Sequence, residues 1–140
     1  MLYTLYADGG SRGNPGHAGS GAVVFDASGK RILEVADYIG ETTNNVAEYE
    51  AVLRGLKKLA AEFHEGYWRE NDLLVRMDSK LVIEQMKGVY RVKHPNLIPR
   101  YMEVKNVIAR SFGKVAFEHV PRERNKDADE LANRAMDRKR

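Results

Sequence analysis

Cysteine is absent from this 140-residue sequence, so the chain has neither disulfide bonds nor a thiolate metal site. This absence fits a reducing compartment. No apolar run approaches the roughly 20 residues that a membrane-spanning helix needs, and the N-terminus lacks the basic and apolar regions of a secretory signal. Internal repeats, low-complexity tracts and linkers are also missing. We therefore predict a single domain over residues 1–140, a cytoplasmic location and no contact with membranes.

Charge is unevenly distributed along the chain. Residues 1–70 carry 7 Lys/Arg and 10 Asp/Glu, a net charge of −3, whereas residues 71–140 carry 16 Lys/Arg and 10 Asp/Glu, a net charge of +6. A basic half beside an acidic half indicates a polyanionic partner such as a nucleic acid. Charge alone slightly favours an ordinary solvated surface, so the choice depends on the motifs.

Hydrophobic periodicity predicts strands at Met1–Ala7, Gly19–Phe25, Arg31–Ile39, Leu73–Met77 and Val115–Val120. Helical spacing predicts helices at Asn45–Phe63, Leu81–Met86, Asn96–Ser111 and Lys126–Arg138. The order β-β-β-α-β-α-α-β-α indicates an α/β fold with a five-stranded mixed sheet, in which three antiparallel strands precede two parallel ones. No helix has a second apolar face, which favours a monomer.

Acids stand at the ends of four predicted elements: Asp8 after the first strand, Glu48 in the first turn of the long helix, Asp78 after the fourth strand and Asp129 in the first turn of the last helix. Parallel strands end at one edge of a sheet, so we expect these acids to converge. Oxygen-only ligands suit Mg²⁺ or Mn²⁺, and two such ions can clamp a phosphodiester displacement. Singly, Asp78 could be a helix cap, Asp129 a favourable charge at a helix N-terminus and Glu48 a surface residue.

Four segments together resemble ribonuclease H of type 1: Asp8–Gly16, Thr42–Glu48, Met77–Ser79 and Val120–Ala132. The resemblance extends over the whole chain in order and is greatest to the short bacterial and archaeal members. It implies the ribonuclease H-like fold. It also implies an endonuclease that hydrolyses the RNA strand of an RNA/DNA hybrid and leaves 5′-phosphate and 3′-hydroxyl ends.

The same resemblance implies a role for individual residues. Asp8 would bridge two Mg²⁺ ions, for which Mn²⁺ could substitute. Asp129 would be a further ligand of the ion that activates water, and Glu48 and Asp78 would be ligands of the other ion. Substrate contacts would come from Gly9, Gly10, Ser11, Asn14, Thr43, Asn44, Asn45, Ser79 and Lys80, with Thr43 gripping a DNA phosphate. The asparagines also have ordinary alternatives, since Asn14 suits a turn and Asn44 and Asn45 suit a helix cap.

Three departures from the family pattern affect these expectations. The loop Pro121–Asn125 contains no histidine, so Arg122 or Glu123 would take the product-release role. Glu41 stands where well-known members have an arginine, which would weaken the phosphate pocket. The basic protrusion of longer members is missing, and Val89–His94 would supply its charge.

Other functions compete with this hypothesis. A nuclease or transposase-like enzyme of the same fold could act on DNA, although the asparagines and the glycine-rich segment favour RNA. A non-catalytic nucleic-acid-binding module is disfavoured because clustered carboxylates would repel phosphates. The chain could also be one domain of a larger enzyme, although Met1 directly precedes the first strand and favours a free-standing protein.

Overall fold

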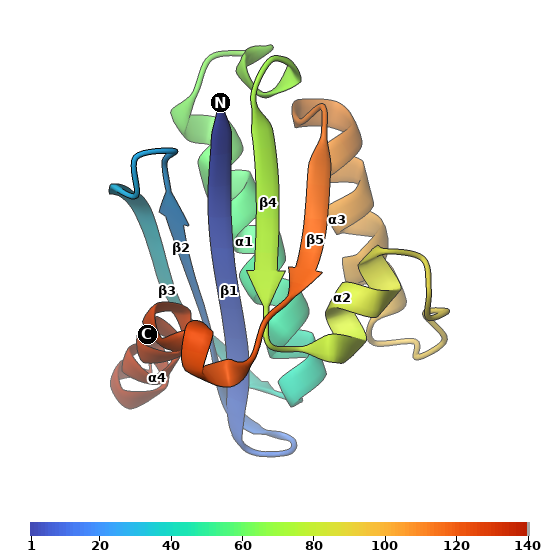
Figure 1. Ribbon diagram of the computed structural model, residues 1–140. Helices are drawn as coiled ribbons and strands as arrows, with labels where there is room; N and C mark the ends of the chain where they lie inside the picture. The colour runs from blue at the N-terminus through green and yellow to red at the C-terminus, as the bar shows by residue number, and fades with distance from the viewer. Residues whose placement is uncertain (140) are drawn as a thin grey trace.

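The computed structural model describes residues 1–139, and residue 140, the last of the predicted domain, lies outside the described residues. Five strands form one sheet in the order β3-β2-β1-β4-β5 (Figure 1). Their bounds are Leu2–Gly13 (β1), Gly16–Phe25 (β2), Arg31–Thr42 (β3), Asp72–Met77 (β4) and Val115–His119 (β5). The pairs β1/β2 and β2/β3 are antiparallel, while β1/β4 and β4/β5 are parallel. The predicted mixed sheet is therefore confirmed.

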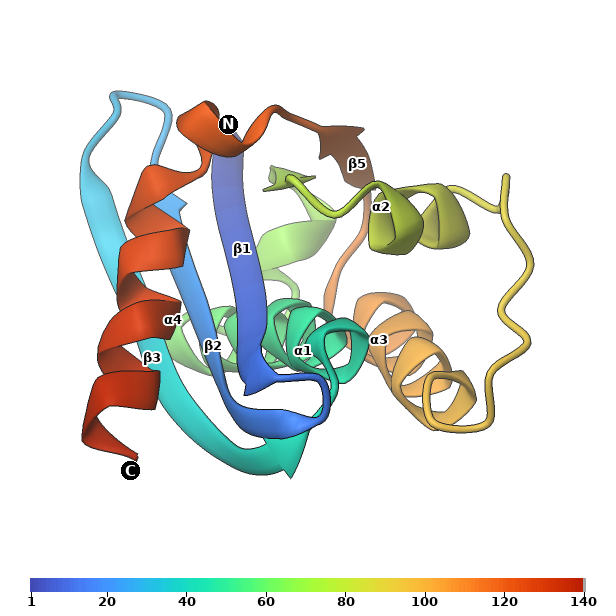
Figure 2. The same cartoon turned by 90° about the horizontal axis from the view of Figure 1, so that it is seen from below.

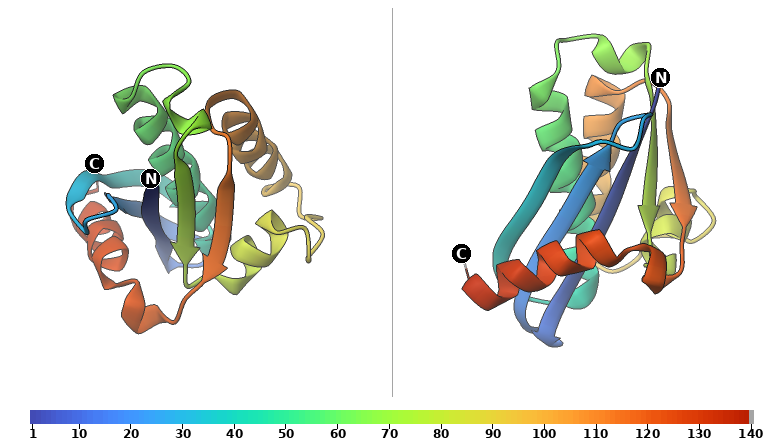
Figure 3. Two further views of the ribbon diagram at one scale, coloured as in Figure 1. Left: turned by 45° about the horizontal axis from the view of Figure 1, so that its top comes forward. Right: turned by 60° about the vertical axis from the view of Figure 1, so that its left-hand side comes forward.

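The helices lie on both faces of this sheet. They are Asn44–Glu62 (α1), Lys80–Met86 (α2), Ile98–Ser111 (α3) and Lys126–Arg138 (α4). Figure 2 and Figure 3 show α1 and α3 side by side on one face, while α4 crosses the opposite face over β1, β2 and β3. Short 3₁₀ turns, Tyr67–Arg69 and Arg122–Arg124, occupy segments that we predicted as loops. No helix within residues 1–139 has the length and apolarity to cross a membrane.

The main core lies between the sheet and the helices α1 and α3. Leu5, Val52 and Leu56 are fully buried there, and each such side chain contributes about 1.5–3 kcal/mol to folding. At the end of the sheet where β1 begins, Trp68 packs edge-on against Tyr3 with their ring centroids 4.8 Å apart. This packing anchors β1, the strand that carries the first candidate acid.

The first hairpin differs from the prediction. We predicted that the first strand ends at Ala7 and that a glycine-rich turn follows, but β1 continues to Gly13 and pairs with β2 from Thr4 to Gly13. A Cβ on Gly9 would lie 2.2 Å from the backbone carbonyl of Ala47, and one on Gly21 would lie 2.3 Å from the carbonyl oxygen of Ala128. The glycines thus allow α1 and α4 to pack directly on the hairpin, and a propensity-based turn was the wrong interpretation.

Candidate active site

The four predicted carboxylates line one cavity of about 310 Å³, which we call the acid cleft. It is lined by Asp8, Glu48, Asp78 and Asp129 together with Gly9, Gly10, Ser11, Arg12, Asn44, Arg122, Asn133 and Met136. The convergence predicted from the element ends therefore appears in the structure.

Each acid reaches the cleft from a different element. The parallel pairing of β1 with β4 stops at Tyr6, so Asp8 lies inside β1 but beyond the part covered by β4. Asp78 directly follows β4, and Asp129 lies in the first turn of α4, as predicted. Glu48 follows the first turn of α1, because that helix begins at Asn44, one residue earlier than predicted.

The side chains that cap α1 and α2 are not the ones that our alternative interpretations assigned to capping. Thr43 Oγ1 accepts the backbone N–H of Val46 at 3.3 Å and caps α1. Ser79 Oγ accepts the backbone N–H of Val82 at 3.3 Å and caps α2. The capping alternatives for Asp78, Asn44 and Asn45 are therefore wrong.

Burial and the charge of neighbouring carboxylates shift two of the acids, Asp8 and Glu48, toward their neutral forms. Asp8 is only 9% exposed, and burial, reinforced by the carboxylates of Asp78 and Asp129, raises its pKa to about 9. Burial also raises the pKa of Glu48 to about 7, with a smaller contribution from Asp78 and an opposing hydrogen bond from Ser79. The raised pKa favours the protonated form of Asp8 at neutral pH when no cation is bound.

The donor chemistry of the cleft fits a hard divalent cation. Its candidate ligands are four carboxylates, and oxygen-only sites suit Mg²⁺ or Mn²⁺. The guanidinium of Arg12 lies 2.6 Å from Asp137 and is thus already paired. Within residues 1–139, no group of three or more His, Asp or Glu side chains already has the spacing to hold an ion. Asp8, Glu48, Asp78 and Asp129 are the residues that would hold such an ion, and the ion would compete with a proton for the carboxylate of Asp8.

A polar network joins the hairpin to the start of α1. Asn44 Oδ1 accepts the backbone N–H of Ser11 at 2.7 Å and its hydroxyl at 3.1 Å. Asn14 Oδ1 accepts the backbone N–H of Asn44 at 3.2 Å. We call Ser11, Asn14 and Asn44 the polar ridge. Three residues that we predicted to bind substrate are thus held together by hydrogen bonds.

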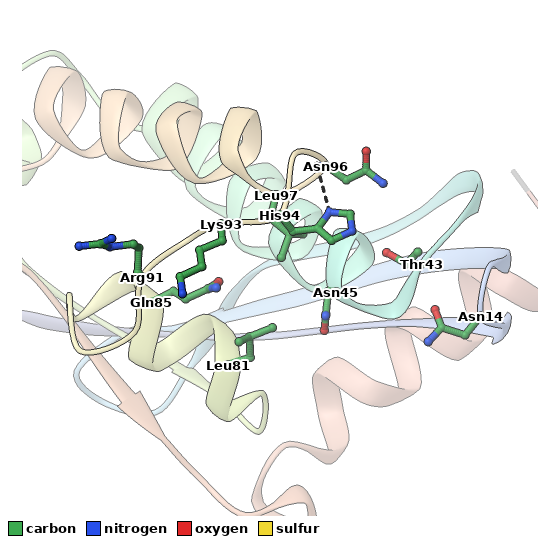
Figure 4. A pocket seen from close by; sticks show the side chains of 10 residues that line it. All are labelled: Asn14, Thr43, Asn45, Leu81, Gln85, Arg91, Lys93, His94, Asn96 and Leu97. Atoms are coloured by element: carbon green, nitrogen blue, oxygen red, sulfur yellow. Dashed lines mark hydrogen bonds between the residues drawn. The ribbon is translucent and has the colours of Figure 1, made fainter.

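A second cavity, of about 390 Å³, lies on the other side of this ridge (Figure 4). We call it the basic groove; it is lined by Asn14, Thr43, Asn45, Leu81, Gln85, Arg91, Lys93, His94, Asn96 and Leu97. Its lining contains no acid. Thr43 and Asn45 line this groove while Asn44 lines the acid cleft, so the start of α1 separates the two cavities. Arg91 and Lys93 come from the segment that we expected to replace the basic protrusion.

Gln85 is a groove residue that sequence reasoning missed. It is 4% exposed, and its Oε1 accepts a hydrogen bond from the hydroxyl of Tyr49 at 2.6 Å. The signal was present, because Gln85 interrupts the apolar side of the short helix between Val82 and Met86. Arg12 and Asn133 of the acid cleft were also missed.

Only some of the remaining predicted residues line the acid cleft. Gly9, Gly10 and Arg122 line the acid cleft. Ser79 is buried and uses its hydroxyl to cap α2, while Lys80 and Glu123 are exposed and line neither cavity. The substrate and product-release roles of these residues stay predictions.

The chain resembles proteins of a known family over most of its length. A family described as "Reverse transcriptase-like" matches residues 6–135. The bifunctional protein Rv2228c of Mycobacterium tuberculosis is 48% identical over 141 residues, which cover 98% of this chain and 36% of that protein. Ribonuclease HI of Halobacterium salinarum is 39% identical over 132 residues, which cover 94% of this chain and 63% of that protein. This chain therefore spans less than two thirds of both relatives.

Solved structures resemble the chain over nearly its full length. LC11-RNase H1, isolated from compost, superposes with a TM-score of 0.91 and is 44% identical, with coverage of 98% of this chain and 96% of the other. A structure of LC11-RNase H1 in complex with an RNA/DNA hybrid gives a TM-score of 0.89 at 43% identity, with 97% of each chain covered. Both likenesses include the elements that carry the four acids.

Proposed function

The chain belongs to the reverse transcriptase-like family, among its type 1 ribonucleases H, and on this premise we propose that it hydrolyses the RNA strand of RNA/DNA hybrids. One observation carries the proposal: four carboxylates from four elements line one cleft beside a hydrogen-bonded polar ridge. The complex of LC11-RNase H1 with a hybrid supports the choice of substrate. A cytoplasmic location, a monomeric state and a single domain over residues 1–140 stay predictions.

Asp8, Glu48, Asp78 and Asp129 are the residues that would hold divalent ions, Mg²⁺ or Mn²⁺. When bound, such ions supply positive charge at the attacking and leaving oxygens of a phosphodiester displacement. The role of the protein is then to bring an RNA phosphate to the carboxylates in one orientation. We propose products with 5′-phosphate and 3′-hydroxyl ends, and Arg122, at the rim of the cleft, as the residue that helps them leave.

The polar ridge would distinguish RNA from DNA. A 2′-hydroxyl both donates and accepts hydrogen bonds, and it is the group by which proteins tell the two nucleic acids apart. Ser11 and Asn44 offer a hydroxyl and an amide beside the carboxylates, and Gly9 and Gly10 also line the cleft. The RNA strand would thus lie over the acid cleft with its sugars against the ridge.

The basic groove would hold the DNA strand. Arg91 and Lys93 supply positive charge for phosphates, and Thr43, Asn45 and Asn96 supply hydrogen-bonding groups. Because Thr43 and Asn45 flank Asn44 in sequence, the two strands would straddle the start of α1. The charge of the groove also compensates for Glu41, which is exposed on β3 and faces His17 at 3.8 Å.

The test uses one labelled RNA strand, presented alone, paired with DNA and paired with RNA. Each form is incubated with protein and Mg²⁺ or Mn²⁺, with a chelator in a parallel reaction. We expect cleavage of the DNA-paired strand only, and none with chelator. Binding without cleavage would contradict the proposal and favour a non-catalytic module, and cleavage of a DNA strand would favour a DNA-directed nuclease.

A further inference from the structure

Asn125 is a buried polar residue that none of the proposed roles uses. It lies between the 3₁₀ turn Arg122–Arg124 and α4, and it is 1% exposed. Its side-chain amide Nδ2 donates to the backbone carbonyl of Ala7 at 2.9 Å and to Asp78 Oδ1 at 3.1 Å. One NH₂ group therefore joins β1 to the residue that follows β4.

The backbone of Asn125 extends this connection to a third acid. Its carbonyl oxygen accepts the N–H of Asp129 at 3.1 Å, the hydrogen bond that begins α4. Its own N–H donates to the carbonyl of Arg122 at 2.9 Å. Ala7 immediately precedes Asp8, so a single residue is bonded to Asp78, to the neighbour of Asp8 and to the backbone of Asp129.

The contacts require an asparagine in particular. Two acceptors, a carbonyl and a carboxylate, share one NH₂ group, whereas an ionised aspartate there would offer no donor and would add a fifth carboxylate beside Asp78. The carbonyl oxygen of the same side chain, Oδ1, is buried and has no hydrogen-bond partner among residues 1–139. The donor half of the amide therefore makes both of the side-chain contacts that link Asn125 to β1 and to Asp78.

We propose that Asn125 is a positioning residue that sets the spacing of Asp8, Asp78 and Asp129 for ion binding. This inference rests on the proposed function. The bond to Nδ2 occupies one oxygen of Asp78 and holds the carboxylate in one rotamer, which leaves its second oxygen available as a ligand. Partners of this kind, which orient ligating groups without touching the ion, typically change metal affinity or activity by about 10–100-fold when they are removed.

The experiment compares Asn125→Ala with Asn71→Ala. Asn71 is a matched control, since its Nδ2 donates to the carbonyl of Tyr67 at 2.9 Å far from the acid cleft. For each variant we would measure kcat and KM on the hybrid, the Kd for Mn²⁺ by calorimetry and the melting temperature. For Asn125→Ala we expect kcat to fall and the Mn²⁺ Kd to rise, each by about 10-fold or more, with KM within about threefold.

Several outcomes would overturn the proposal. A purely structural role predicts that both variants melt earlier while kcat and the Mn²⁺ Kd of the folded protein stay at the wild-type values. An effect on KM alone would place Asn125 in substrate binding instead. If Asn125→Ala does not fold, Asn125→Ser, which keeps one donor, replaces it, and we expect intermediate losses. If the wild type does not cleave hybrids, the proposed function fails, but the Mn²⁺ comparison still decides the role of Asn125.

Discussion

The acid cleft and the basic groove lie on opposite sides of the start of α1, yet they are built differently. The four acids come from β1, α1, α4 and the residue after β4, so hydrogen-bonded elements fix their positions. The two strongest cations of the groove, Arg91 and Lys93, come from the irregular segment between α2 and α3. Chemistry at a phosphate demands placement within fractions of an ångström, whereas gripping a backbone phosphate tolerates movement. This difference indicates that the acid cleft carries out the reaction and that the basic groove holds the nucleic acid.

The largest expected effect comes from Asp8→Asn. The substitution keeps the shape of the side chain and removes a ligand charge at the centre of the acid cleft. We expect hydrolysis of the hybrid to fall by at least about 10³-fold, since positive charge at the reacting phosphate is lost. Hybrid affinity, measured by fluorescence anisotropy, should change by less than about threefold, because the groove cations remain.

Asp37→Asn is the control for this substitution. Asp37 is a surface carboxylate that pairs with Arg54 at 3.0 Å and lies outside both cavities. The Asp37→Asn variant should cleave the hybrid at the wild-type rate. Equal activity in the Asp8→Asn variant would show that the acid cleft is not the reactive site.

The next effect tests the groove through the double variant Arg91→Ala/Lys93→Ala. Loss of two phosphate contacts should raise KM by about 10-fold, leave kcat nearly unchanged and reduce the salt slope of binding by about 2. The control Lys30→Ala/Lys114→Ala removes the same charge from exposed positions outside both cavities. A fall in kcat with unchanged KM would contradict the division of roles.

A third effect is on stability and its pH dependence. The pKa of Asp8 is raised from 3.8 to about 9 by folding, so the folded protein binds more protons than the unfolded chain between these pH values. The stability that protonated Asp8 contributes is fully present below pH 3.8 and is lost as the pH rises through about 9. Melting temperature in chelator should therefore fall across this range in the wild type and fall less steeply in Asp8→Asn. A steeper fall in the variant would show that Asp8 is already ionised.

The smallest effect should come from Tyr49→Phe, which removes the hydroxyl that orients Gln85. The lost hydrogen bond should lower the free energy of unfolding by about 1 kcal/mol. Hybrid affinity should fall by about threefold if Gln85 contributes to the groove. Tyr38→Phe, which removes a 2.6 Å contact with His17 outside both cavities, is the control in denaturant titrations and should leave hybrid affinity unchanged.

Sequence reasoning succeeded where a pattern extends over a whole element. The apolar stripe of α4 predicted its bounds, Lys126–Arg138, and so placed Asp129 in the first turn. It failed at the β1–β2 hairpin, because Gly9 and Gly10 suggest a turn by propensity, while the close packing of α1 on Gly9 requires this glycine in a strand. The groove was harder still. Gln85 and Asn96 lie eleven positions apart and line the same groove only because the segment between α2 and α3 folds back.

The most direct test of the division between cleft and groove pairs a protein change with a substrate change. Hybrids would carry neutral methylphosphonate linkages in either the DNA or the RNA strand, and binding to the wild type and to Arg91→Ala/Lys93→Ala would be compared. We predict that neutral DNA linkages weaken wild-type binding but add little to the loss in the variant, while neutral RNA linkages weaken both proteins equally. Two results would contradict the assignment of the groove to DNA. One is that neutral DNA linkages weaken binding as much in the variant as in the wild type, and the other is that neutral RNA linkages weaken binding less in the variant than in the wild type.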